Sequence, residues 1–172
     1  MIEETKKMEL SERENYPRLV SSELIEKIKE FEGLKLEAYL CPGGVWTIGY
    51  GHTEDVRKGD RISAELAEHY LLEDIAKAET QVLMLKVCKY QGQLDALVDF
   101  VFNIGIEKLK ASTLLRHIKS KMPREVIAKE FRRWCYANGK RIKGLYSRRL
   151  WDIECYFNKE YTIEEIKEML NK

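Results

Sequence analysis

The chain has 172 residues, of which 44% are hydrophobic and 34% charged, a balance typical of a globular protein with its own core. Its 30 Lys and Arg residues against 29 Asp and Glu residues give a formal net charge of +1, so no global field favours nucleic acid or anionic lipid. The first residues lack the apolar centre of a signal peptide, and no apolar run reaches about 18 residues. We expect no nucleic-acid partner and no stable membrane association, and we expect a monomer.

The spacing of cysteine and histidine disfavours both disulfide and metal chemistry. The 4 cysteines include no Cys-x-x-Cys pair, and none of the 3 histidines pairs with a cysteine at ligand spacing. Without an export signal, the cysteines are expected to be reduced thiols. We predict no metal and no cofactor, and three cysteines that pack as small apolar residues: Cys88, Cys135 and Cys155.

Periodicity and turn residues divide the first half of the chain into a few elements. Residues 1–18 are charged and aperiodic, so a flexible extension is expected there. The elements that follow are predicted to be a helix capped by Ser21 or Ser22 and ended by Gly33, a β-hairpin with strands at 36–41 and 45–50, a turn-rich segment at 53–62 with a short third strand, and a long helix from the Ser63 cap to near Val87.

The second half of the chain is predicted to be helical. Its expected elements are an amphipathic helix at 93–104, a short helix from the Ser112 cap through Ile118, a helix from Pro123 to about Tyr136, a Gly- and Lys-rich loop at 137–145, a helix at 146–157, and a last helix opened by the capping box at Thr162 and Glu165. Strands near the N-terminus followed by many helices indicate an α+β fold.

Three unlike polar groups surround the predicted hairpin. Glu32 ends the first helix, Cys41 follows nine positions later, and Thr47 comes six positions after Cys41. A carboxylic acid that is partly buried keeps its proton more readily, as a general acid must. This spacing therefore predicts acid-assisted bond cleavage, with Glu32 as the acid.

The register of the hairpin decides whether these groups can meet. If residues 42–44 form a three-residue loop, Tyr39 opposes Thr47, and Cys41 and Thr47 share one face about 7–8 Å apart or less. If the loop is only Gly43 and Gly44, Thr47 points to the other side. The hypothesis needs the first register.

Other chemistries at this segment are weaker. Cys41 and His52 would be a thiol nucleophile and its base in a peptidase, but a reactive cysteine usually lies at a helix N-terminus or beside a cation. Gly49-Tyr50-Gly51 lacks the third glycine and the following helix of a nucleotide loop.

Seven basic residues gather late in the chain, and two interpretations stay open for them. They are either the solvated surface of a helix and loop or a binding face for an anionic polymer. They are Arg132, Arg133, Lys140, Arg141, Lys143, Arg148 and Arg149.

The segment from Glu32-Gly33 through Cys41-Pro42-Gly43-Gly44-Val45-Trp46-Thr47-Ile48-Gly49-Tyr50-Gly51-His52-Thr53 resembles the active-site segment of phage-type lysozymes, the endolysins of glycoside hydrolase family 24. The resemblance covers about residues 22–157 and continues in the same order at Gln93, Ala96-Leu97-Val98, Phe102-Asn103-Ile104-Gly105, Ser112-Thr113-Leu114-Leu115, Phe131, Trp134, Gly144-Leu145 and Arg148-Arg149.

The resemblance implies the roles of the site residues. Glu32 would protonate the glycosidic oxygen, Thr47 would help to hold the attacking water, and Cys41 would take a position that is often Asp. The substrate-binding residues that it implies are Phe102, Asn103, Arg148 and Arg149, with Arg148 or Arg149 approaching Glu32. The structural ion pair that it implies is His52 with Asp74.

The resemblance also implies a lysozyme-like layout with an active-site cleft. A sheet lobe at about 33–62 and a helical lobe at about 90–159 would be joined by a helix at about 63–87, within a lysozyme domain of residues 19–159. Residues 160–172 would form a C-terminal helical extension, expected to dock on the core.

Cys41 is the departure from the usual pattern. Beside a carboxylate and away from water, the pKa of its thiol is expected to rise, which would leave it neutral at pH 7. An inverting glycosidase uses two carboxyl groups with a water between them, so the stereochemical outcome stays open here.

The function implied is that of an endolysin with muramidase activity, which hydrolyses β-1,4 bonds between N-acetylmuramic acid and N-acetylglucosamine in peptidoglycan and lyses the host cell. The enzyme is expected in the host cytoplasm and at the wall only after another protein permeabilises the membrane. The alternatives are a chitin-type glycanase and a catalytically impaired peptidoglycan-binding protein.

Overall fold

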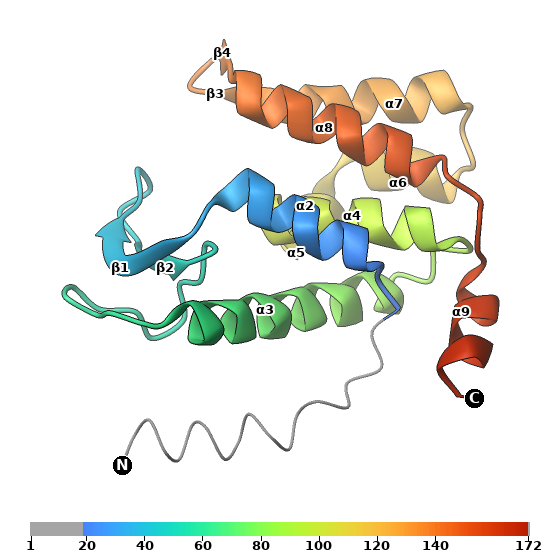
Figure 1. Ribbon diagram of the computed structural model, residues 1–172. Helices are drawn as coiled ribbons and strands as arrows, with labels where there is room; N and C mark the ends of the chain where they lie inside the picture. Colours follow the sequence, from blue (N-terminus) through green and yellow to red (C-terminus); the bar gives the residue numbers. More distant parts are fainter. Residues whose placement is uncertain (1–18, 172) are drawn as a thin grey trace.

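The computed structural model describes residues 19–171, so the expected extension at 1–18 lies outside the described residues. Figure 1 shows a small two-stranded lobe at one side of a group of helices. The elements are α2 (Ser22–Glu32), β1 (Lys35–Leu40), β2 (Trp46–Gly49), α3 (Ala64–Met84), α4 (Gln91–Ile104), α5 (Ile106–Ala111), α6 (Thr113–Lys119), α7 (Arg124–Arg132), the 3-10 turn η1 (Arg133–Cys135), β3 (Tyr136–Ala137), β4 (Lys140–Arg141), α8 (Lys143–Tyr156) and α9 (Ile163–Leu170). The α+β fold is confirmed.

The first hairpin forms in the register that the three-residue loop predicts. Tyr39 lies opposite Thr47, and Leu40 lies opposite Trp46, in an antiparallel pair. The turn is closed by the amide of Gly44, which donates to the Cys41 carbonyl at 2.8 Å. Side chains two residues apart on β1 share a face, so this register brings the Cys41 and Thr47 side chains to the same face of the hairpin.

The expected third strand at 53–62 is reduced to a single bridge. Arg61 pairs with Glu37 of β1, and the neighbouring backbone contacts are Ala38 N to Asp60 O at 2.9 Å and Ile62 N to Leu36 O at 3.0 Å. The turns of residues 53–60 leave no extended run long enough for a ladder. The prediction of a third strand is wrong, because this segment forms a single bridge instead of a ladder. The segment still lies along the edge of β1 that does not pair with β2.

Helix α3 leads from the small lobe into the helical part (Figure 1). The Ser63 side chain caps it by accepting from the Leu66 amide at 3.2 Å, as predicted. The helix ends at Met84, three residues before the expected end, because Lys86 takes a positive φ of 55° that a helix cannot continue through.

Helix α4 is the centre of the core. Its residues from Leu94 to Val101 are all buried, the charged Asp95 and Asp99 included. It packs against both α3 and α8. Gly92 lets α8 approach closely, since a Cβ there would lie 2.2 Å from the Cys155 carbonyl oxygen.

The region before α8 differs from the expected loop at 137–145. Tyr136 pairs with Arg141 across a small hairpin, β3–β4, and Asn138 and Gly139 at its tip have φ of 50° and 74°. An Asn-Gly pair with both φ values positive is typical of a tight two-residue hairpin turn, and this signal was present in the sequence. Helix α7 consequently ends earlier than predicted, and α8 begins earlier.

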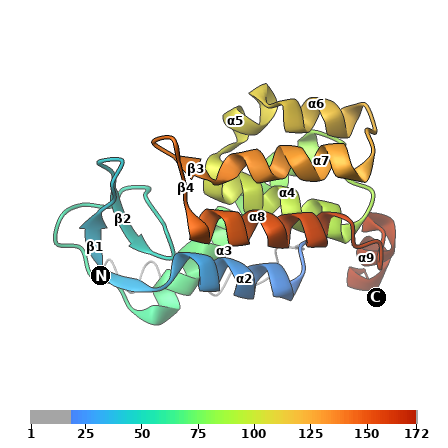
Figure 2. The same ribbon diagram turned by 90° about the horizontal axis from the view of Figure 1, so that it is seen from above.

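Both ends of the described chain are fastened to the helical part. The amides of Leu19 and Val20 donate to Glu79 of α3 at 2.5 and 2.9 Å. At the other end, α9 buries Ile163 and Ile166, and the Ile163 amide donates to the Lys89 carbonyl at 2.9 Å. Figure 2 places α9 at the end of the helices opposite β1 and β2. Among residues 19–171, no helix is long and apolar enough to cross a bilayer.

Candidate active site around Glu32

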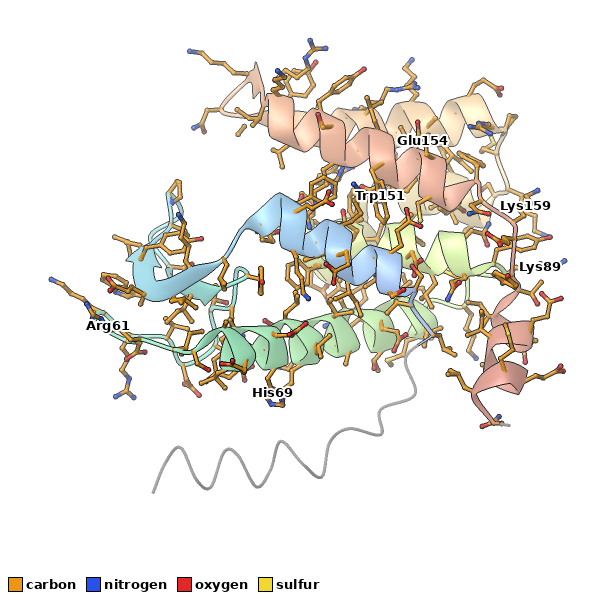
Figure 3. All side chains as sticks on the ribbon, viewed as in Figure 1. Arg61, His69, Lys89, Trp151, Glu154 and Lys159 are labelled. Carbon is orange, nitrogen blue, oxygen red and sulfur yellow. The ribbon has the colours of Figure 1, made fainter. Side chains whose placement is uncertain are left out.

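Glu32 is the last residue of α2, and the chain turns away from the helix immediately after it. Gly33 ends the helix with a φ of 69°, and its amide donates to the Lys29 carbonyl at 2.9 Å. Leu24 and Ile28 bury the inner face of α2, while Phe31 packs edge-on against Trp151 of α8 at 6.2 Å between ring centroids. Figure 3 shows Trp151 between the two helices. This packing fixes the end of α2 against α8.

The Glu32 carboxylate lies between the hairpin and the helical part. Its side chain keeps 24% of its surface exposed, enough to be reached by a solute. On one side is the backbone of Gly51, where a Cβ would come to 3.3 Å from Glu32 Oε2. Gly51 has a φ of 91°, so both the space and the backbone conformation favour glycine at this position.

On the other side, Glu32 meets Arg148. Arg148 Nη1 donates to Glu32 Oε1 at 2.6 Å, and the guanidinium stacks over the Phe31 ring at 5.0 Å. Asp99 accepts from two other nitrogens of the same guanidinium, Nε at 2.9 Å and Nη2 at 2.8 Å. Burial lowers the pKa of Arg148, but the carboxylates of Asp99 and Glu32 outweigh it and raise that pKa above its ordinary value.

Arg149 is turned away from the site, which corrects its expected role in substrate binding. Its side chain is fully buried. It lies 3.4 Å from Asp99 and 2.8 Å from Asp152, and its guanidinium stacks over Phe100. Consecutive residues of a helix point about 100° apart, so only one of the two arginines can face Glu32. The resemblance left these two arginines open, and the structure selects Arg148.

Thr47 and Cys41 share the face of the hairpin that the site requires. Thr47 is buried, and its hydroxyl donates to the Val45 carbonyl at 3.1 Å. Cys41 is half-buried beside the turn. Backbone hydrogen bonds from Val45 and then Gly43 lower the pKa of the Cys41 thiol.

The lowered pKa of Cys41 reverses the expectation from the sequence. That expectation assumed a thiol out of water beside a carboxylate. The structure instead places the thiol at the rim of a turn whose backbone N–H groups stabilise the thiolate. Loss of the Cys41 proton is therefore easier than for an ordinary cysteine.

Tyr39 is a neighbour of the site that the sequence reasoning missed. Burial raises the pKa of its hydroxyl, and the negative charges of Glu32 and Cys41 raise it further, so the phenol lies near both groups. A signal was available, because Tyr39 lies two residues before Cys41 in the sequence and opposes Thr47 in the hairpin.

His52 is engaged on α3. Its Nδ1 lies 2.7 Å from Asp74 Oδ2, and its ring stacks on Tyr70 at 4.3 Å between centroids. The His52 backbone also exchanges two hydrogen bonds of 2.9 Å with Ile48. The contact between His52 and Asp74 is therefore present, and it leaves the imidazole in a poor position to activate Cys41.

Phe102 and Asn103 lie near the end of α4. Both are half-buried. The Asn103 Oδ1 atom is buried and has no hydrogen-bond partner among residues 19–171. A buried amide oxygen without a partner is uncommon in a folded protein.

The late basic residues separate into two groups. Arg148 and Arg149 are buried and paired, as described above. The exposed members are Arg132, Arg133, Lys140, Arg141 and Lys143. Within the described part of the chain, no group of three or more His, Cys, Asp or Glu side chains is placed to hold a metal ion.

A helix-end glutamate facing a small hairpin, with a long helix leading into a helical lobe, defines a lysozyme-like glycoside hydrolase. The Phage lysozyme family model matches residues 29–152, and the chain belongs to this family. An endolysin of Acyrthosiphon pisum secondary endosymbiont phage 1 is 44% identical over 127 residues, which are 71% of this chain and 86% of the relative.

Two solved structures share both the fold and much of the sequence. The muramidase domain of SpmX from Asticaccaulis excentricus has a TM-score of 0.73 at 35% identity, over 81% of this chain and 97% of that one. The endolysin from Escherichia coli O157:H7 phage FAHEc1 has a TM-score of 0.68 at 34% identity, over 83% of this chain and 95% of that one.

Proposed function

We propose that this chain is an endolysin with muramidase activity, which hydrolyses the β-1,4 bond between N-acetylmuramic acid and N-acetylglucosamine in peptidoglycan. Membership of the phage lysozyme family and the likeness to a muramidase domain support this activity. The observation that carries the proposal is the placement of Glu32, which is partly exposed beside the hairpin and held by Arg148 at 2.6 Å.

Glu32 is proposed as the general acid. A glycosidic bond breaks when the leaving oxygen receives a proton while positive charge develops on the sugar. Glu32 is the last residue of α2, and its partly exposed carboxyl group lies beside the hairpin. Arg148 fixes one of its oxygens and leaves Oε2 free to face substrate. In this proposal Arg148 orients the acid and does not itself bind the sugar.

Thr47 and Cys41 are proposed to act on the water and on the sugar cation. The Thr47 hydroxyl is held at a fixed place on the hairpin by the Val45 carbonyl, so it can orient a water. The backbone N–H groups that lower the pKa of the Cys41 thiol favour its thiolate form, and a thiolate there would stabilise positive charge on the nearby sugar. Cys41 in this role takes over the electrostatic part of the missing second carboxylate.

Phe102 and Asn103 are proposed to bind substrate. Both side chains are half-buried near the end of α4, and an amide such as that of Asn103 can donate to and accept from the acetamido group that both sugars carry. His52 and Asp74 are proposed as a structural pair, because their contact joins the end of the hairpin to α3.

The reducing ends released from purified peptidoglycan test the activity. Borohydride reduction of the digest followed by mass analysis should give N-acetylmuramitol, because a muramidase frees the reducing end of muramic acid. Glucosaminitol instead would contradict the proposed bond. Retention of peptidoglycan without any new reducing end would favour the impaired binding protein, and equal cleavage of chitin oligomers would favour the chitin-type glycanase.

The enzyme is proposed to accumulate in the host cytoplasm and to act on the wall once another protein permeabilises the membrane. Expression in a bacterial host followed by fractionation tests this. The protein should stay with the cytoplasmic fraction, and lysis should begin only on addition of a permeabilising agent. Spontaneous lysis without such an agent would contradict this route.

A further inference from the structure

Asp99 is a fully buried carboxylate directly behind the residue that holds Glu32. It lies in the middle of α4 and has no exposed surface. Its two oxygens accept from Arg148 Nε at 2.9 Å and Nη2 at 2.8 Å, which makes the pair bidentate. A bidentate pair fixes the plane and direction of a guanidinium, whereas a single hydrogen bond does not.

The direction of the remaining nitrogen follows from this pairing. With Nε and Nη2 occupied by Asp99, Arg148 has Nη1 left, and this nitrogen meets Glu32 at 2.6 Å. Asp99 itself is held from behind, since Arg149 Nη2 lies 3.4 Å from it. The chain of contacts runs from the core of α4 through α8 to the end of α2.

Asp99 also bears on the charge that Glu32 experiences. An arginine whose charge is not offset stabilises the ionised form of a neighbouring carboxylic acid. An ionised acid has no proton to deliver. The negative charge of Asp99 offsets the positive charge of Arg148. Other charged or titratable groups around this cluster are Arg149, Asp152 and Cys155 from α8, Cys135 from η1, Tyr39 from β1, and Cys41 at the turn.

We propose that Asp99 is a positioning residue of the active site, which aims Arg148 at Glu32 and offsets its charge so that Glu32 keeps the proton that it must deliver. This inference rests on the proposed function of Glu32 as the general acid. It adds a residue that touches neither substrate nor Glu32, and it assigns the effect of that residue to both geometry and charge.

The test compares Asp99→Asn with Asp95→Asn. Asp95 is a buried carboxylate on the same helix, one turn earlier, whose partner is Ser21 rather than an arginine. Asp99→Asn should lower kcat about 10- to 100-fold, because the Glu32 carboxyl is no longer held in position. KM should change little, because the residues that bind substrate are not altered. The alkaline limb of the pH–rate profile should move about one unit or more to lower pH, because Arg148 is no longer offset.

The control variant separates positioning from stability. Asp95→Asn is expected to change the unfolding free energy while leaving kcat and the pH–rate profile at wild-type values. If Asp99→Asn lowers stability alone and keeps the wild-type kcat and profile, Asp99 is merely structural and the inference is overturned. Equal shifts of the alkaline limb in both variants would overturn it as well.

A double variant keeps the inference testable if Asp99→Asn does not fold. Asp99→Asn with Arg148→Gln removes both buried charges, a change that proteins often tolerate. In Arg148→Gln alone the uncompensated charge of Asp99 should move the alkaline limb to higher pH, whereas the double variant should lie close to the wild-type position. Equal positions of the limb in Arg148→Gln and in the double variant contradict the inference.

A readout without activity separates this inference from the proposed function. The side-chain carboxyl carbon of Glu32, assigned by its loss in Glu32→Gln, can be titrated by carbon NMR. Its midpoint should fall in Asp99→Asn even if the wild-type protein cleaves nothing. A shifted midpoint in an inactive protein would overturn the proposed function alone, and an unchanged midpoint in an active one would overturn the role of Asp99 alone.

Discussion

Arg148 Nη1 lies 2.6 Å from Glu32 Oε1, and the two residues are 116 positions apart in the chain. The contact joins the end of α2 to the first half of α8, and the Phe31–Trp151 pair packs the same two helices together beside it. The acid proposed for catalysis is therefore placed by the helical lobe as much as by its own helix. Substitutions that displace α8 should therefore change the rate of bond cleavage, because they displace Arg148 relative to Glu32.

Substitutions of Cys41 test whether the site uses negative charge at this position. Cys41→Asp should keep activity within about threefold of wild type, because a carboxylate supplies the charge. Cys41→Ser should lower kcat about tenfold, because a hydroxyl stays neutral and binds water only. Initial rates on purified peptidoglycan measure both.

Cys88→Ser is the matched control for the cysteine series. Burial, followed by the charge of Asp95, raises the pKa of the Cys88 thiol to about 12, which keeps this thiol neutral. Cys88 is also not part of the proposed active site. Its substitution should leave the rate unchanged. Equal rates for Cys41→Ser and Cys41→Asp would show that charge at this position is unimportant.

The His52–Asp74 pair is expected to stabilise the fold without entering the chemistry. Asp74→Ala leaves the buried His52 Nδ1 without its partner at 2.7 Å and should cost about 1–2 kcal/mol of unfolding free energy. Urea denaturation measures the loss. The kcat of the folded fraction should stay at the wild-type value, and a large fall in it would assign the pair to catalysis.

The contact between α4 and α8 depends on Gly92. A Cβ there would lie 2.2 Å from the backbone carbonyl of Cys155, which cannot rotate away, so Gly92→Ala should destabilise by at least about 2 kcal/mol. Gly144→Ala is the control, since nothing lies within 4 Å of its Cβ position on α8. Because alanine favours a helix over glycine, that variant should gain about 0.5 kcal/mol. Similar losses in both variants would contradict the packing account.

Asp95 gives the protein a specific dependence of stability on pH. Burial raises its pKa from 3.8 to about 6, against hydrogen bonds from Ser21 that lower it. A group with a raised pKa in the folded state takes up a proton on folding between these two values. Its contribution to stability is therefore present in acid and is lost as the pH rises through about 6.

Comparison with Asp95→Asn isolates this contribution. The wild-type protein should gain about 1 kcal/mol relative to the variant when the pH falls from 7 to 5. Urea denaturation of both proteins at the two pH values measures the difference. A constant difference between the proteins would show that Asp95 does not titrate in this range.

The parts of the site that local sequence determines were predictable. Gly33 marks the end of α2, and the Pro42-Gly43-Gly44 turn sets the register that aligns Cys41 with Thr47. The choice between Arg148 and Arg149 was not predictable, because it depends on the rotation of α8 about its axis. That rotation is set by contacts with α4 and α2, which are distant in sequence.

Two further features depended on three-dimensional context. The lowered pKa of Cys41 comes from backbone N–H groups whose directions are known only once the turn is built. Asp99 has the same residue type and helical setting as Asp95, and only their partners distinguish them, with Arg148 meeting one and Ser21 the other. The β3–β4 hairpin, in contrast, carried a readable Asn-Gly signal and was missed.

The rate of Glu32→Gln on purified peptidoglycan tests the central claim most directly. Glutamine keeps the size of the side chain and can still accept from Arg148, but it cannot donate a carboxylic proton. Glu30→Gln is the matched control, because Glu30 is exposed on the same helix and pairs with Lys27 at 2.7 Å. We predict that Glu32→Gln releases no reducing ends above background, while Glu30→Gln and the wild-type protein cleave at equal rates. Wild-type activity in Glu32→Gln would contradict the account.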